Sequence, residues 1–85
     1  MLRISIVESS PEASTLRLEG RVIGPWVDEL SRLCASLLKD RASVTLDLSG
    51  VSFVDGDGLD LFRELRTHRV VLQNCSPLVN EQLKE

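Results

Sequence analysis

The segment Asp55-Gly56-Asp57-Gly58 is the part of this sequence whose residue types and spacing suggest a functional site. Two carboxylates stand there beside two glycines, which would relax the backbone. Carboxylates at a helix start accept hydrogen bonds from free backbone N–H groups and lie at the positive end of the helix dipole. A purely structural role is therefore one interpretation of the segment, and a binding site is the other.

Metal binding and catalysis both fit this segment poorly. A calcium loop that began at Asp55 would need glycine at the position of Asp60 and a bidentate glutamate at the position of Arg66. The single histidine, His68, falls at the far end of the predicted helix, so no Ser-His or Cys-His pair can be built near the turn. No glycine loop of the kind that cradles phosphates is present. The sequence predicts no enzyme, no metal and no cofactor.

The elements on either side of the turn follow from hydrophobic periodicity. Val44, Leu46 and Leu48 alternate with polar residues, which is typical of a half-buried strand. Apolar residues then recur at helical spacing, which predicts a helix from about Asp57 to His68. The candidate site therefore lies where a strand gives way to a helix.

The remaining segments predict an α/β fold with the order ββαβαβα. A hairpin of two alternating strands comes first, Gly24-Pro25 starts an amphipathic helix, Val70–Leu72 reads as a short strand, and Ser76-Pro77 starts a last helix. Right-handed crossovers then give a four-stranded mixed sheet with the helices packed mainly on one face. The first strand would lie antiparallel at an edge, and the other face of the sheet should be more polar.

Composition narrows the classes of partner. The 85 residues predict a single domain, 1–85, and 42% hydrophobic with 27% charged residues is ordinary for a folded protein. A net charge of -3 and only Trp26, Phe53 and Phe62 as aromatics argue against nucleic acid. No apolar run is long enough for direct membrane insertion, so we expect a cytoplasmic protein. Cys34 and Cys75 match no metal or redox spacing and are interpreted as reduced thiols.

The segment from Asp47 to Leu59, D-L-S-G-V-S-F-V-D-G-D-G-L, resembles the signature of STAS domains, the family of anti-sigma factor antagonists and sulphate-transporter tails. Almost the whole chain is similar to that family. In bacterial antagonists the turn reads Asp-Ser-Ser-Gly, and a partner that is both anti-sigma factor and serine kinase phosphorylates the second serine. Here Gly56 stands at the first serine position and Asp57 at the phosphoacceptor position.

The resemblance implies a non-enzymatic module that binds an anti-sigma factor or serine-kinase-type partner. A serine kinase cannot phosphorylate Asp57, and a carboxylate carries about half the charge of a phosphoserine. Asp57 would therefore either imitate the phosphorylated state or make the chain a permanent binder, and the first is slightly favoured. The contact surface would comprise the turn Asp55-Gly56-Asp57-Gly58 together with Asp60 and Arg63 on the adjacent helix.

Two other functions stay open. The chain also resembles the small STAS subunits that brace the ATPase of lipid-trafficking ABC transporters, a role that needs no phosphorylatable serine. A phosphotransfer or metal-dependent enzyme is the least favoured reading and predicts a deep pocket at the turn. Trp26, at the start of the first helix, is more plausibly part of the core than of a contact surface.

Overall fold

A computed structural model describes residues 2–40 and 42–83 of the chain. The elements are β1 (Leu2–Ser9), β2 (Ala13–Val22), α1 (Pro25–Asp40), β3 (Ser43–Val54), α2 (Gly56–Arg66), β4 (Val70–Gln73) and α3 (Pro77–Leu83). This sequence of elements confirms the predicted ββαβαβα order.

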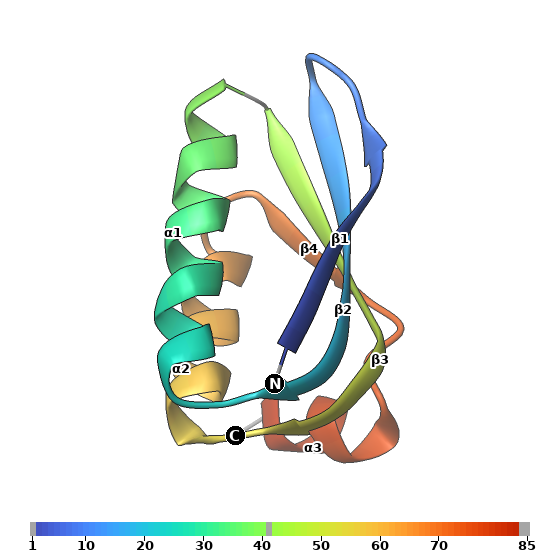
Figure 1. The fold of residues 1–85 in the computed structure, drawn as a ribbon, viewed down its shortest axis with the longest axis vertical. Helices are drawn as coiled ribbons and strands as arrows, with labels where there is room; N and C mark the ends of the chain where they lie inside the picture. Colours follow the sequence, from blue (N-terminus) through green and yellow to red (C-terminus); the bar gives the residue numbers. More distant parts are fainter. Residues whose placement is uncertain (1, 41, 84–85) are drawn as a thin grey trace.

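The sheet has the predicted mixed topology. Its strands lie in the order β1-β2-β3-β4, with β1 antiparallel to β2, and with β3 parallel to both β2 and β4. Helices α1 and α2 run along the same face of the sheet (Figure 1). Because β2, β3 and their following helices form β-α-β units, the carboxyl ends of both strands reach the same edge. That edge holds the turns before α1 and α2.

The core lies between the sheet and the two helices. Its most deeply buried side chains come from alternate positions of β2 and β3 and from the inner faces of α1 and α2, and they are Leu16, Leu18, Val22, Leu30, Cys34, Val44, Leu46, Leu48 and Phe62. Trp26 is half-buried and packs against this cluster, as expected for a core residue. On the opposite face of the sheet Arg17 pairs with Asp47 at 3.7 Å, and the more polar character predicted for that face is confirmed.

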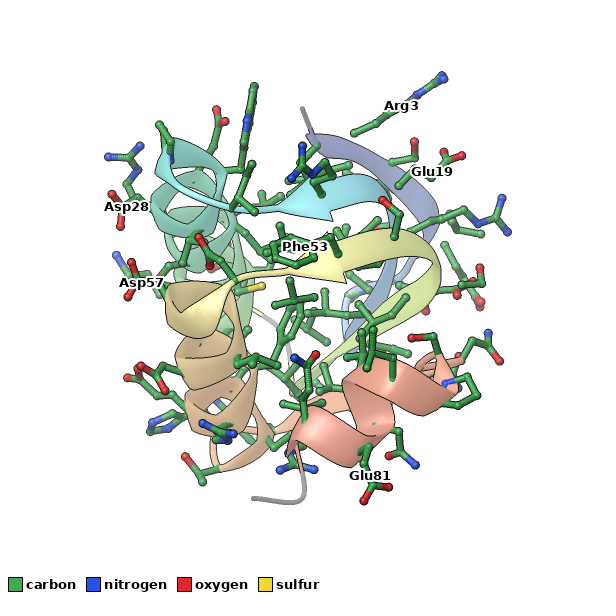
Figure 2. All side chains as sticks on the ribbon, turned by 90° about the horizontal axis from the view of Figure 1, so that it is seen from below. Arg3, Glu19, Asp28, Phe53, Asp57 and Glu81 are labelled. Carbon is green, nitrogen blue, oxygen red and sulfur yellow. The ribbon has the colours of Figure 1, made fainter. Side chains whose placement is uncertain are left out.

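The last helix does not belong to the α1–α2 layer. Strand β4 is short and pairs only with Val44–Asp47 of β3. Helix α3 lies beyond the end of β4, beside the second half of β3 (Figures 1 and 2). Its Val79 and Leu83 are buried, and the Ser76 hydroxyl accepts a hydrogen bond from Val79 N at 3.2 Å, which confirms the predicted capped start.

Candidate functional site

The candidate site is the junction between β3 and α2. Strand β3 ends at Val54, Asp55 is the N-cap, and α2 begins at Gly56, within a residue of the predicted start. The helix ends at Arg66, two residues before the predicted His68. Val54 is in register with Val22, the last residue of β2. The register therefore brings the turn after β2 next to the start of α2.

Asp55 is held in place by hydrogen bonds to the backbone of two neighbouring segments. One carboxylate oxygen accepts a hydrogen bond from Gly58 N at 2.8 Å, and the other accepts from Gly24 N at 3.1 Å. Its backbone N–H donates to Val22 O at 3.1 Å, and its carbonyl accepts from Leu59 N at 2.9 Å. The first bond is the usual N-cap interaction, which satisfies a helix N–H that has no partner inside the helix. Asp55 thus fixes the geometry of the turn.

The two glycines of the turn have different roles, and neither is the one expected. Both were predicted to relax the backbone, but the glycines with positive φ are Gly20 and Gly24. Gly58 is buried, and a Cβ there would lie 2.7 Å from Val54 Cγ1 and 3.0 Å from Val22 O. At Gly56 a Cβ would meet nothing within 4 Å. Gly58 therefore allows α2 to pack closely on the sheet, whereas Gly56 faces open space.

Asp57 is the free carboxylate of the site. It lies in the first turn of α2 and is exposed, and its side chain has no hydrogen-bond or ion-pair partner within residues 2–40 and 42–83. Figure 2 shows Asp57 and Asp28 projecting from the starts of α2 and α1 on the same outer side of the helix layer. A group that binds Asp57 can therefore approach from solvent without displacing another side chain.

Asp60 and Arg63 are the other predicted contact residues, and they form an ion pair at 3.3 Å. The Asp60 side chain is 75% exposed, but that of Arg63 is only 35% exposed. Arg63 Nη2 also donates to the carbonyl of Gln82 at 2.8 Å, which ties α2 to the end of α3. Arg63 is thus at least partly structural. Sequence reasoning missed this contact because nothing in the local pattern indicates where α3 lies.

The described residues contain a shallow groove away from the turn. It has a volume of about 170 Å³, lies between α1 and α2, and is lined by Ser31, Ala35, Leu38, Leu61, Glu64, Leu65 and His68. None of the four turn residues lines it.

Two further features of the described residues concern metal binding and membrane insertion. Over residues 2–40 and 42–83, no three His, Cys, Asp or Glu side chains are grouped so that they could hold a metal ion. In the same part of the chain, every helix is too short or too polar to cross a membrane.

Comparison with known proteins places the chain in a structural class. A family model for the STAS domain matches residues 5–84. No match was found among curated proteins. The solved structure of the anti-sigma factor antagonist SpoIIAA in its unphosphorylated form is similar, with a TM-score of 0.77 and 18% identity over 96% of this chain and 82% of that one.

Two further solved structures share the fold. An uncharacterised DUF3478 protein with a SpoIIAA-like fold, from Shewanella loihica PV-4, has a TM-score of 0.62 and 12% identity over 98% of this chain and 74% of that one. The crystallised protein Mglu has a TM-score of 0.65 and 22% identity over 82% of this chain but only 19% of its own. At these identities the likeness to all three establishes the fold alone.

Proposed function

This chain belongs to the STAS domain family, and from that premise we propose that it is a non-enzymatic interaction module of the cytoplasm. Its partner is an anti-sigma factor or serine-kinase-type protein. The contact surface is the turn Asp55-Gly56-Asp57-Gly58 with the neighbouring exposed sides of α1 and α2. The family membership and the SpoIIAA-like fold support a role in binding proteins.

The observation that carries the proposal is that two residues of the turn stabilise the fold and the other two face solvent. Asp55 and Gly58, which match the family's pattern, are used by the fold itself through hydrogen bonds and close packing. Gly56 and Asp57, which depart from the pattern, face open space and solvent. Substitution at these two positions leaves the frame intact and changes only what a partner meets. The departures therefore bear on recognition rather than on folding.

Asp57 supplies a permanent negative charge at the position where the family's antagonists carry a phosphorylatable serine. A phosphoserine carries about -1.5 to -2 charges, so the carboxylate supplies roughly half of that. A partner surface shaped for a neutral hydroxyl disfavours this charge unless it offers a cation. Asp57 accordingly imitates the phosphorylated state and holds the kinase-type partner off.

The test is a pull-down from lysate of the source organism with three baits, namely the wild type, Asp57→Ser and Asp57→Asn, with bound proteins identified by mass spectrometry. Asp57→Asn is the matched control, because it removes the charge at nearly constant shape. We expect a kinase-fold protein on the Ser and Asn baits but not on the wild type. Equal capture on all baits would show a permanent binder. Capture of no kinase-fold protein on any bait would contradict the proposal.

A second candidate function is favoured by one feature of the turn. Neither of its two outward-facing positions, Gly56 and Asp57, carries a hydroxyl that a kinase could phosphorylate. A small STAS subunit that braces the ATPase of a lipid-trafficking ABC transporter needs no such switch. On this reading all three baits retain a transporter ATPase, and the charge at position 57 makes little difference to capture.

A further inference from the structure

Strand β1 is an open edge of the sheet. It pairs with β2 on one side, and no strand of residues 2–40 or 42–83 lies on its other side. The opposite edge strand, β4, is half as long and is followed directly by the segment that leads to α3. An unpaired edge presents a row of backbone N–H and C=O groups that a further strand can use. β1 is thus the longer of the two available edges.

The apolar residues on the helix-covered face of β1 become more exposed from the start of the strand toward its hairpin end. Leu2, Ile4 and Ile6 share the face covered by helices, but Leu2 is 5% exposed, Ile4 is half-buried and Ile6 is 63% exposed. The neighbour of Ile6 on β2, Leu16, is fully buried. Figure 1 shows the reason, because β1 slants away from α1 and α2 toward its hairpin end. The helix layer therefore leaves Ile6 uncovered.

We propose that β1 pairs antiparallel with β1 of a second copy of this chain, about a two-fold axis at Ser5. Facing residues in such a pair lie on the same side of the sheet. Centring the pair on Ser5 sets Ile4 of each copy opposite Ile6 of the other. The exposed Ile6 of each copy is then covered by the half-buried Ile4 of the other copy. The two sheets join into one that continues across both copies.

The charges on β1 suit this antiparallel arrangement. Arg3 and Glu8 lie near opposite ends of the strand. They are in register with Glu19 and Thr15 of β2, on the face of the sheet away from the helices. Glu8 shares this face with Arg3 because the register of β1 with β2 shifts between Ile6 and Glu8. Antiparallel pairing about Ser5 therefore brings Arg3 of one copy near Glu8 of the other, where opposite charges attract. Parallel pairing in the same register would instead place Arg3 beside Arg3 and Glu8 beside Glu8 of the other copy, where like charges repel. The edge is therefore self-complementary in one direction only.

The dimer is weak, because the pairing covers only a short stretch of strand. An interface of this kind falls well below the roughly 1,200 Å² that stable complexes bury. The test is sedimentation velocity over about a hundred-fold range of protein concentration. A change in the dimer dissociation constant between variants converts to a free energy through RT ln Kd. We expect the wild type to move from monomer to dimer as concentration rises. A wild type that stays monomeric throughout overturns the proposal.

Two variants locate the interface. Ile6→Lys puts a charge against the facing isoleucine and should weaken self-association by about ten-fold or more. Val71→Lys is the matched control, since Val71 is 51% exposed on the other edge strand, β4. It should dimerise like the wild type. Equal weakening by both variants would overturn the assignment to β1. Circular dichroism confirms that each variant is folded.

Cysteine cross-linking tests the register. Residues facing each other in an antiparallel pair have Cα atoms about 4.5 to 5.5 Å apart, which suits a disulfide. Ser5 faces Ser5 of the other copy across the axis, so Ser5→Cys should form a cross-linked dimer under mild oxidation. Arg3→Cys, on the same strand, lies several residues along the pair from the same cysteine of the other copy and should not. Equal cross-linking of the two variants would contradict a two-fold axis at Ser5.

Discussion

The carboxylate of Asp55 accepts a hydrogen bond from the backbone N–H of Gly24, 31 positions earlier in the chain, at 3.1 Å. Its other oxygen caps α2 through Gly58 N at 2.8 Å. A single side chain thus holds the turn before α1 against the start of α2. The surface that we assign to a partner includes these two helix starts, so its shape depends on Asp55.

Replacing Asp55 should therefore destabilise the fold. Asp55→Ala removes both bonds and is expected to cost about 2 kcal/mol of unfolding free energy, the upper end for an N-cap. Asp55→Asn keeps one acceptor oxygen and should cost less. Asp57→Asn removes only an exposed charge near the helix start, for about 0.5 kcal/mol. Urea denaturation measures all three. A loss in Asp55→Ala no larger than that in Asp57→Asn would contradict the structural role.

The two glycines of the turn should respond oppositely to alanine. Gly58→Ala places a methyl group 2.7 Å from Val54 Cγ1 and 3.0 Å from Val22 O, and overpacking of this kind costs about 1 to 3 kcal/mol. Gly56→Ala meets no atom within 4 Å and should be neutral or stabilising by up to about 1 kcal/mol. Thermal and urea unfolding of the pair provide the comparison. Equal effects would mean that open space at Gly56 and crowding at Gly58 do not govern stability.

Local periodicity was sufficient to predict the elements and their order. Two local patterns show which face of each element is buried: the alternation at Val44, Leu46 and Leu48, and the helical spacing after Asp57. The buried faces of the sheet and of the helices pack against each other to form the core. Long-range contacts leave no such local pattern. The bond from Gly24 N to Asp55 depends on strand register, and the crowding at Gly58 depends on how closely α2 approaches β2. Neither could be read from spacing.

Asp47 should make stability depend on pH in the acid range. Its carboxylate accepts from Ser49 N at 2.9 Å and from the Asn74 side chain at 3.1 Å, and these bonds, with Arg17 nearby, hold the pKa of Asp47 below its ordinary value. The unfolded chain therefore takes up the proton first as pH falls. The stabilisation by Asp47 is complete above its unfolded pKa of about 3.9 and is lost as pH falls through the lower folded value.

Comparison of Asp47→Asn with the wild type measures this contribution. We expect the variant to be less stable than the wild type near neutral pH, and the difference to shrink as the solution is acidified below about pH 4. Asn74→Ala removes one of the donors and should reduce the pH-dependent part without abolishing it. Urea unfolding at several pH values provides the curves. A difference that stays constant from neutral to acid pH would refute the assignment.

Two arginines of α2 should control how firmly α3 is attached. Arg63 Nη2 donates to Gln82 O at 2.8 Å and Arg66 Nη2 donates to Leu83 O at 3.3 Å, so charged donors meet carbonyls at the end of a seven-residue helix. A helix that short is not stable by itself. Arg63→Met keeps much of the side-chain volume but removes the shorter bond, which, as a bond to a charged group, is worth about 1.5 to 3 kcal/mol.

Hydrogen exchange of the α3 amides should therefore accelerate by about ten-fold or more in Arg63→Met, since 1.4 kcal/mol corresponds to ten-fold in local opening. Arg66→Met should have a smaller effect, and Arg32→Met, on the exposed side of α1, should have none. Unchanged α3 exchange in Arg63→Met would show that packing of Val79 and Leu83 alone holds the helix. Because Arg63 also lies beside Asp60, a loss of partner binding in this variant would combine two causes. Asp60→Asn is thus the cleaner probe of the proposed contact surface.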